Sequence, residues 1–463
     1  MKVKLSDEIL IKAIIIVLIL SIPITSLIKE FYSSYHSYMI KMLKNSDKTR
    51  ITIWSNDNYS KDIYARLIQR FNSTKGNEEN IEIQYRVIGS NYNQILEESL
   101  KNEVAIDLYK YPEGKLRMIK EGYMIPIEDI PGGREYLEEF KEDLKPNQNI
   151  VQGKVYSVPH SIINLKLMYN RDIFKEVGIT DKHGNPTPPK TWGDVINYSE
   201  IISEYYDSRV YGYVIPGKWK EFHKWEIMYP AYSSIGHTGY DFKEGKYKYI
   251  ELKPYMEVLI KMKENNILFP RPEEIDKETA NYLFAEGKVA MKMAQSWDVA
   301  VFDYKFPCKY NWSICDIPVI DLKHRHGEYI YLDDSFVLGP SSLSKPKEVI
   351  KVLEWINSPQ FLEELYLEKR GIPFDENIIN SINDNTNSGS WNGFCEREKS
   401  EYMLELPDAN IISSGDYIRN IFLRILMGDT DIDRALKDLD ERYNTALAHA
   451  IKEGLEFTSY LED

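Results

Sequence analysis

The stretch GKVYSVPHSIINLKLMYNRDIF, residues 153–174, decides the fold because it changes conformation several times within a short length. It begins as a strand and breaks at Pro159, whose ring fixes the backbone angle and removes an amide donor. Alternation over residues 165–170 predicts a second strand, with its odd-numbered residues facing inward and Lys166 and Met168 facing outward. We interpret the stretch as a strand that crosses from one lobe of the protein into another.

The chain before this crossing has the pattern of a doubly wound α/β unit. An apolar strand at 50–55 is followed by an amphipathic helix in 58–73, and the alternating run 80–88 is typical of a half-buried strand. A second helix in 91–103 and a strand within 105–111 continue the pattern. Such units bind ligands beyond the carboxyl ends of their strands. The residues expected to form this cleft wall are Trp54, Asn56, Asp57, Tyr109 and Tyr111. A core position is the alternative for the ring of Trp54.

The chain after the crossing is mostly helical in pattern. A capping box of Thr191 and Asp194 predicts a helix that starts at Trp192, a residue that we assign to the core. Residues 380–393 are poor in apolar side chains and predict a loop. Residues 429–454 place their apolar side chains on one face, which predicts a long amphipathic helix.

A second extended crossing is expected at EYIYLDDSFVLGP, residues 328–340. A chain of 463 residues exceeds one ordinary core, so two lobes are the simplest organisation. The boundaries that we predict are 50–158 for the first part of lobe 1, 159–332 for the first part of lobe 2, 333–385 for the return to lobe 1, and 386–463 for a C-terminal helical part of lobe 2.

The N-terminus predicts a membrane anchor. Residues 9–28 are mostly apolar with a single charge at Lys12, and a helix of this length spans a hydrocarbon layer of about 30 Å. Lysines on its N-terminal side place the start of the chain in the cytoplasm and the bulk outside. We assign residues 1–29 to the anchor and 30–49 to a stalk. A cleavable signal peptide is the alternative, although no small-x-small cleavage motif follows Leu20.

Composition excludes several functions. The formal net charge of −14 opposes attraction to nucleic acid or to anionic lipid. Three cysteines cannot provide a disulfide framework, and whether Cys308 pairs with Cys315 stays open. The spacing of Cys315, His324 and His326 fits no zinc pattern, so neither a metal nor a cofactor is expected.

No catalytic motif is recognisable in the sequence. It contains no Gly-x-Ser-x-Gly, no His-Glu-x-x-His, no phosphate-binding loop and no dinucleotide fingerprint. Asp333 and Asp334 are adjacent, and in a regular strand they would point to opposite faces, which suits a shared acid and base poorly. A carbohydrate-active enzyme is therefore the weaker alternative.

Several segments together resemble the extracellular solute-binding proteins of carbohydrate type that serve ABC importers. The matching segments, in chain order, are ITIWS (51–55), ARLIQRFN (65–72), GKVYSVPHSIINLKLMYNRDIFKEVGI (153–179), PPKTWGDV (188–195), LFAEGKVAMKMAQSW (283–297) and DTDIDRALKDLDERYN (429–444). The resemblance implies a two-lobed, periplasmic-binding-protein-like α/β fold whose lobes close around a ligand about hinge crossings. It also implies a sugar or oligosaccharide ligand and delivery to ABC permease subunits. Relatives usually carry a lipid-modified cysteine after the signal peptide, whereas this chain has none near its start.

Sugars present apolar faces and polar edges, so their sites combine flat aromatic rings with hydrogen-bonding side chains. We predict that Trp54, Tyr111 and Trp297 stack on the ligand. Asn56, Asp57 and His160 are expected to form hydrogen bonds with it, and Tyr109, Trp225 and Asp334 to lie nearby. The retained N-terminal helix leaves one alternative with the same fold, a membrane-tethered ligand sensor that acts with a sensor partner.

Overall fold

The computed structural model describes residues 48–89, 91–112, 114–382, 389–397, 400–403, 406–407 and 413–456. The predicted anchor and nearly all of the predicted stalk lie outside these ranges. Within them, no helix is both long and apolar enough to span a bilayer. The chain divides into a small unit, Met1–Arg50 with Phe71–Glu82, and a large unit, Ile51–Arg70 with Ile83–Asp463. All residues of the site described below belong to the large unit.

The first sheet has the strand order β13-β3-β1-β2 among the described residues. β1 and β3 run parallel, with Trp54 opposite Tyr109, and β13 joins β3 in antiparallel fashion. The strand–helix–strand pattern predicted for this part of the chain is confirmed. The bounds are β1 (Thr49–Ser55), α2 (Lys61–Ser73), α3 (Lys75–Glu78), β2 (Ile81–Val87), α4 (Tyr92–Lys101), β3 (Leu108–Lys110), α5 (Lys115–Lys120), α6 (Gly133–Leu137), β4 (Ile150–Val151), β5 (Lys154–Val155), β13 (Phe336–Leu338), α13 (Pro346–Ile356) and α14 (Pro359–Leu367).

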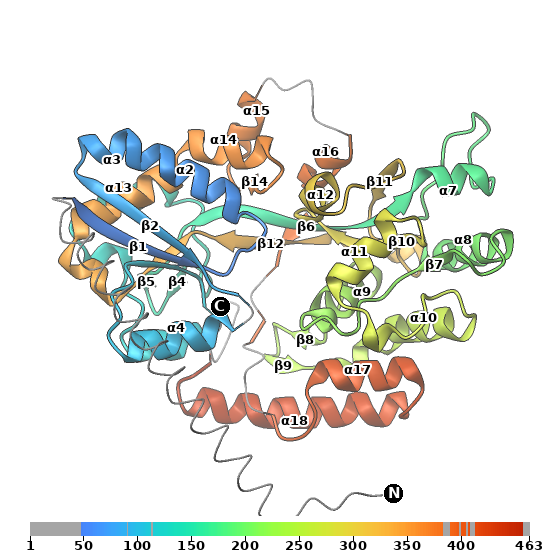
Figure 1. Ribbon diagram of the computed structural model, residues 1–463. Coiled ribbons are helices and arrows are strands. Elements are labelled where there is room, and N and C mark those ends of the chain that lie inside the picture. Colours follow the sequence, from blue (N-terminus) through green and yellow to red (C-terminus); the bar gives the residue numbers. More distant parts are fainter. Residues whose placement is uncertain are drawn as a thin grey trace, which may run out of the picture. The chain divides into compact units, whose positions relative to one another are not determined.

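The second sheet is built around the long strand β6 (Pro159–Asn170), which contains the predicted crossing. Its order is β15-β12-β6-β10-β7, and β11 and β14 also pair with β6 in the described part of the chain. β12 runs antiparallel to β6 and leads almost directly into β13 of the first sheet, so it forms the second predicted crossing. Figure 1 shows β6 and β12 side by side. The strand bounds are β7 (Tyr211–Tyr213), β8 (Tyr240–Asp241), β9 (Lys246–Tyr247), β10 (Val289–Gln295), β11 (Trp312–Cys315), β12 (Glu328–Asp334), β14 (Ile372–Pro373) and β15 (Ser400–Tyr402).

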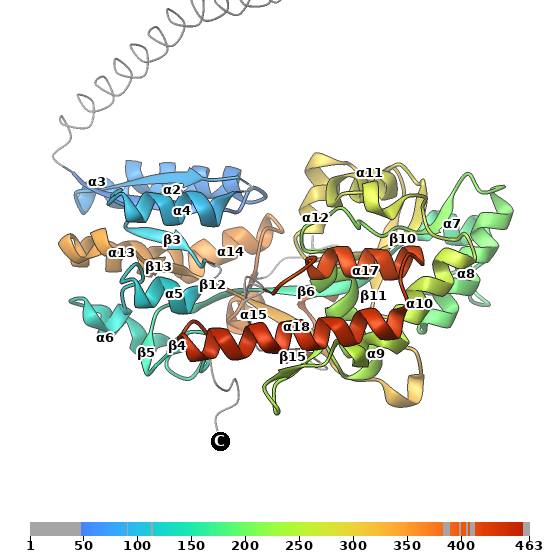
Figure 2. The ribbon, with the colours of Figure 1, turned by 90° about the horizontal axis from the view of Figure 1, so that it is seen from below.

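The helices that follow β6 supply most of the larger hydrophobic core. The predicted capping box is present, since the Thr191 hydroxyl accepts from the Asp194 amide and Trp192 is buried. The long C-terminal helix is also confirmed as α18, which lies beside α17 in Figures 1 and 2. The helix bounds are α7 (Arg171–Glu176), α8 (Trp192–Tyr205), α9 (Tyr229–Ile235), α10 (Lys253–Glu264), α11 (Lys277–Ala285), α12 (Asp298–Ala300), α15 (Glu376–Ser381), α16 (Gly389–Cys395), α17 (Ile418–Met427) and α18 (Ile432–Lys452).

Two local predictions are wrong. The segment 380–393 is not simply a loop, because α16 begins within it and buries Trp391 and Phe394 completely. Two aromatic anchors are enough to hold a short helix in a run whose composition is otherwise polar. β6 does not expose Lys166 and Met168, which are 4% and 0% exposed. Since β6 is paired along both edges and is buried on both faces, alternation does not separate inside from outside.

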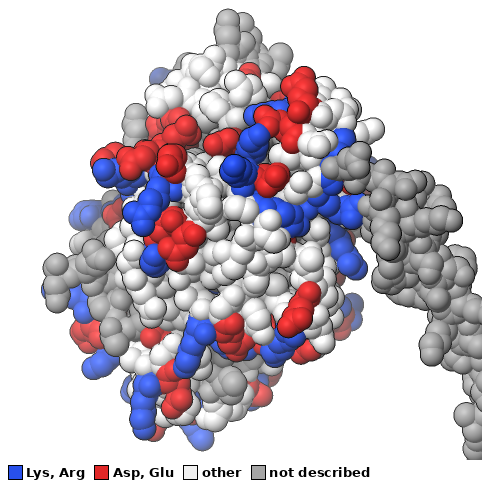
Figure 3. Space-filling model, turned by 90° about the vertical axis from the view of Figure 1, so that its left-hand side faces the viewer, with Lys and Arg blue, Asp and Glu red and all other residues white. Residues whose placement is uncertain are grey.

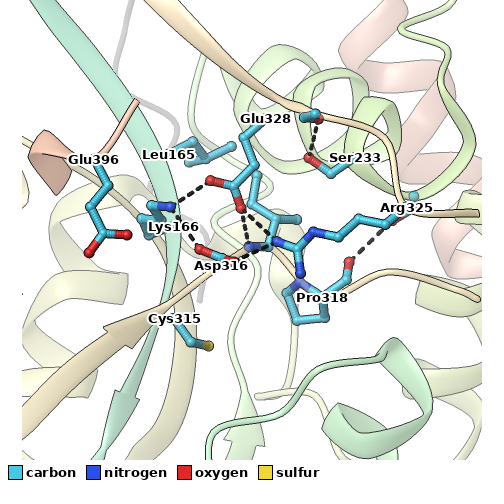
Figure 4. A network of polar contacts seen from close by, with 12 residues as sticks. Leu165, Lys166, Ser233, Cys315, Asp316, Pro318, Arg325, Glu328 and Glu396 are labelled. Carbon is cyan, nitrogen blue, oxygen red and sulfur yellow. Dashed lines mark hydrogen bonds and ion pairs between the residues drawn. The ribbon is translucent and has the colours of Figure 1, made fainter. Parts of the chain in front are cut away.

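Lys166 is buried because acidic side chains neutralise it (Figure 4). Its ammonium lies 2.6 Å from Glu328 at the start of β12 and 2.9 Å from Asp316. Arg325 lies 2.8 Å from Asp316 and 3.4 Å from Glu328, and the Ile317 amide donates to Glu328 over 2.8 Å. This network ties β6 to β12 and to the loop that precedes β12.

Candidate ligand-binding cleft

Two cavities of similar size lie where the ends of β1 and β3 face the second sheet. The first, called the Trp225 cavity, has a volume of about 300 Å³, and the second, called the Trp297 cavity, about 280 Å³. The Trp225 cavity is lined in part by Asn56, Lys110, Tyr111, Gln148, Trp225, Tyr229, Tyr331, Asp333, Asp334 and Tyr417. The Trp297 cavity is lined in part by Asn56, Asp57, Lys110, Ser161, Ser296, Trp297, Asp333, Arg370 and Trp391.

The two cavities meet at three residues that line both, Asn56, Lys110 and Asp333. Lys110 stands at the end of β3, and its ammonium lies 3.1 Å from the Asp333 carboxylate. The same ammonium donates to the Asp334 carbonyl over 2.7 Å. The ion pair therefore links the first sheet to the β12 crossing at the junction of the two cavities. We describe the two cavities together as one cleft.

Aromatic rings form a continuous wall along the cleft. The Trp225 and Trp297 rings are in edge-to-face contact, with centroids 5.3 Å apart and planes at 73°. Trp225 also contacts Tyr229 at 5.0 Å and Tyr331 at 6.0 Å. Because Trp225 lines one cavity and Trp297 the other, this wall runs from the first into the second.

The segments that carry these two tryptophans are irregular. Trp225 lies in a π-helical segment, η3 (His223–Met228), and Trp297 precedes α12 and a second π-helical segment, η6 (Val301–Lys305). π-Helical turns are rare and are concentrated at functional sites, because the extra residue redirects side chains. In this protein they lie next to the residues that form the aromatic wall.

Polar groups on β12 face the same cleft. A register shift separates Asp333 from Asp334, and both line the Trp225 cavity. The prediction that they point to opposite faces of a regular strand is therefore wrong. Asp333 accepts from the Ser161 hydroxyl over 3.1 Å, and Asp334 accepts from the Asn149 amide over 2.8 Å and from the Ser157 hydroxyl over 3.2 Å. These side chains have separate partners, so they do not form a shared acid–base pair.

His160 is used for internal hydrogen bonds. It is 2% exposed, and its Nδ1 lies 2.9 Å from the Asn357 side-chain oxygen. Because the Asn357 amide nitrogen donates to Tyr136 and Ser335, its oxygen is the acceptor, and His160 carries the proton on Nδ1. Nε2 then accepts from the Tyr64 hydroxyl over 3.1 Å. Burial lowers the pKa of His160 to about 4, so the ring is neutral.

The sequence-predicted residues are distributed unevenly. Asn56, Tyr111, Trp225 and Asp334 line the Trp225 cavity, and Asn56, Asp57 and Trp297 line the Trp297 cavity. His160 borders a much smaller cavity of about 20 Å³.

Trp54 and Tyr109 line none of these three cavities. Trp54 is 4% exposed, with the Arg86 guanidinium 5.1 Å from its ring centre, and the Tyr109 hydroxyl donates to the Tyr123 carbonyl over 2.7 Å. Both are core residues in this structure, as the alternative for Trp54 had it.

Sequence reasoning missed several cleft residues. Tyr331 lies in the predicted second crossing, two positions before Asp333, so the crossing itself was a signal for it. Arg370 and Trp391 gave no local signal because the chain brings them to the Trp297 cavity from distant segments. Both hold a buried donor without a protein acceptor, the Nε of Arg370 and the Nε1 of Trp391. A ligand oxygen in this cavity could satisfy them.

The cysteines and the predicted zinc ligands contribute nothing to the cleft. Cys308, Cys315 and Cys395 are free thiols, so Cys308 and Cys315 are not bridged. Across the described ranges, no group of three or more His, Cys, Asp or Glu side chains is arranged to hold a metal ion.

Comparison with known proteins identifies the family. Residues 66–383 match the model of the bacterial extracellular solute-binding proteins, which is more than half of the chain. The chain belongs to this family. A comparison with curated proteins finds no match.

Solved structures share the fold of this solute-binding protein. The GacH receptor of Streptomyces glaucescens GLA.O aligns with a TM-score of 0.69 at 16% identity, over 87% of this chain and 99% of its own. A solute-binding protein of Thermotoga lettingae TMO gives 0.69 at 20% identity, over 86% and 100%. MalE from Bdellovibrio bacteriovorus gives 0.64 at 20% identity, over 87% and 100%. These likenesses establish a mixed α/β, periplasmic-binding-protein-like fold.

Proposed function

We propose that this solute-binding protein takes up a neutral sugar or oligosaccharide in the cleft, without altering it, and delivers it to an ABC permease. The observation that carries the proposal is the continuous aromatic wall of Tyr229, Trp225 and Trp297, which polar side chains such as Asn56 and Asp334 accompany across both cavities. Flat rings match the apolar faces of sugar rings, and the polar groups match their hydroxyls.

The charge of the lining favours a neutral ligand. The Trp225 cavity has four lysines and four carboxyl groups, namely Lys110, Lys115, Lys220 and Lys224 against Glu221, Asp333, Asp334 and Glu456. The Trp297 cavity has two of each, Lys110 and Arg370 against Asp57 and Asp333. Each lining therefore sums to zero. A charged solute would require an excess of the opposite sign.

The predicted residues take the following roles in this proposal. Trp225, Trp297 and Tyr331 stack on the ligand, and Asn56, Asp57, Tyr111 and Asp334 bind its hydroxyls. Trp54 and Tyr109 support the cleft from the core of the first sheet, and His160 fixes neighbouring side chains instead of contacting the ligand.

The relatives support a sugar as the ligand. The Streptomyces receptor was solved with acarbose, the Thermotoga protein with α-D-tagatose and the Bdellovibrio protein with maltotriose. The Thermotoga protein is described as an ABC transporter component, and the family is extracellular. We extend both points to this chain, with residues 9–28 as a single-pass anchor that holds the lobes on the extracytoplasmic side. The lobe boundaries predicted from the sequence, 50–158, 159–332, 333–385 and 386–463, are part of this proposal.

Calorimetry on the full-length protein tests the assignment. A panel of neutral mono- and oligosaccharides is first screened by thermal shift, because a ligand that binds only the native state raises its stability. Any detergent used must lack a sugar headgroup, which would compete for the cleft. Trp225→Ala should weaken binding of the best sugar by roughly 30-fold, or about 2 kcal/mol, as expected for a buried aromatic contact.

The control is Tyr205→Ala, which removes an aromatic ring that is 53% exposed and lies outside the described cavities. It should leave the affinity unchanged. Equal affinity in wild type and Trp225→Ala would contradict the proposed cleft, and conversion of the sugar to a product would contradict binding without chemistry.

A further inference from the structure

A cluster of buried charges lies directly behind the aromatic wall. Its four members are Glu226, Lys277, Lys292 and Asp298, which are 3%, 5%, 1% and 0% exposed. Charged side chains are seldom buried this deeply unless they are paired, and a buried charge that loses its partner is strongly destabilising. Solute binding as described above uses none of the four directly.

Asp298 is the centre of this cluster. Its carboxylate lies 2.7 Å from the Lys277 ammonium and 3.1 Å from that of Lys292, and it accepts the Gln295 amide over 3.2 Å. Burial alone would raise the pKa of Asp298, but the two lysines lower it below its usual range. Asp298 is therefore ionised and holds the ends of α11 and β10 at the start of α12.

Two members of the cluster are the sequence neighbours of the two tryptophans. Glu226 follows Trp225 in η3, and Asp298 follows Trp297 at the start of α12. The edge-to-face contact of the two rings thus bridges the same two segments that the buried charges connect from behind. A displacement of Glu226 or Asp298 would move the adjoining ring.

Glu226 is the member whose charge can change. Burial raises its pKa to about 8, although Lys277 and Lys292 lower it, and burial lowers the pKa of Lys292 to about 8. One carboxylate oxygen of Glu226 is buried without a hydrogen-bond partner. When Glu226 is ionised, the cluster has two positive and two negative groups, whereas protonation leaves an excess of one positive charge.

The groups that face Glu226 come from five elements. They are Lys292 on β10, Lys277 on α11, Asp298 on α12, the Tyr213 hydroxyl on β7, and the Tyr255 hydroxyl on α10, which donates to the Glu226 carbonyl over 3.2 Å. Two of these groups are positive, one is negative and two are neutral phenols. An ionised Glu226 completes the balance of charge.

We propose that Glu226, Lys277, Lys292 and Asp298 act as positioning residues that hold Trp225 and Trp297 as one two-ring platform, and that ionisation of Glu226 completes this arrangement. The consequence for ligand rests on the proposed function. A sugar that covers the wall excludes water from it, which favours the state with balanced charge. Affinity should therefore rise with pH between 6.5 and 8, by at most tenfold per pH unit for one proton.

The first test needs no ligand. Near-ultraviolet circular dichroism of the full-length protein, which reports indoles held in a fixed asymmetric arrangement, is followed from pH 6.5 to 9.5. Wild type should show a transition near pH 8 that is absent in Trp225→Phe and in Trp297→Phe. Glu226→Gln, which keeps the shape and cannot ionise, should abolish the transition, and Glu226→Asp, which still titrates, should retain one.

The second test uses maltotriose as the probe in calorimetry at pH 6.5 and pH 8. Wild type should bind more tightly at pH 8, and Glu226→Gln should bind equally at both. Glu257→Gln is the control, because its carboxylate is 58% exposed on α10, and it should behave as wild type. A transition that persists in Glu226→Gln, or that ignores both tryptophan variants, would overturn the inference. Failure of wild type to bind maltotriose would count against the proposed function, and the ligand-free spectra would then decide the inference alone.

Discussion

Replacing Lys166 with methionine should destabilise the protein by about 3 kcal/mol at pH 7. Lys166 and Glu328 are 5% and 4% exposed in their side chains and 2.6 Å apart, and breaking a buried pair from one side costs about 3–5 kcal/mol. The lower end applies because Arg325 remains 3.4 Å from Glu328. Methionine preserves the apolar stem, so the loss comes from the charge that Glu328 no longer faces.

The pH dependence of this loss has a definite sign. Burial raises the pKa of Glu328 even beside Lys166, and removal of the lysine raises it further. A carboxyl group with a raised native pKa binds its proton more tightly when folded, so the deficit of Lys166→Met should shrink as pH falls from 7 to 5. The double variant Lys166→Met with Glu328→Leu removes both charges and should lie within about 2 kcal/mol of wild type.

Urea unfolding followed by circular dichroism measures these differences from the transition midpoints. The reasoning would be refuted if Lys166→Met cost less than about 1 kcal/mol, or if the double variant were less stable than the single variant.

Two further predictions concern the cleft and its surroundings. Trp391→Phe keeps the ring and removes the buried indole donor, so it should leave stability nearly unchanged and weaken sugar binding by about 2- to 12-fold in calorimetry, the value of one hydrogen bond; an unchanged Kd would exclude this donor from the site. Neutral, buried His160 takes up a proton only near pH 4 when folded but near pH 6.5 when unfolded, so stability should fall by about 2 kcal/mol on its account between pH 7 and pH 5; a His160→Gln variant with the same slope in urea titrations would contradict this.

Much of the secondary structure could be predicted because it depends on local patterns. Alternation predicted β1 and β2, the 3.6-residue period predicted α2 and α18, and the Thr191 capping box predicted the start of α8. The crossing at Pro159 was also visible, because proline interrupts a strand in a recognisable way.

Features that depend on distant residues could not be predicted. Lys166 was placed outside because the carboxylate that neutralises it, Glu328, is 162 positions away. The cleft likewise combines Arg370 and Trp391 with residues after β1, a proximity that no local pattern encodes.

The acidic surface was visible only as a total. The net charge of −14 does not show that basic and acidic side chains lie interspersed on the face in Figure 3. Nor does it show that the charges lining the two cavities balance.

A crystal structure of the full-length protein with the sugar that raises its melting temperature most would test the central claim most directly. The account predicts electron density for that sugar against the Trp225 and Trp297 rings, with its hydroxyls within hydrogen-bonding distance of Asn56 or Asp334. A sugar bound elsewhere, with both rings uncovered, would contradict it.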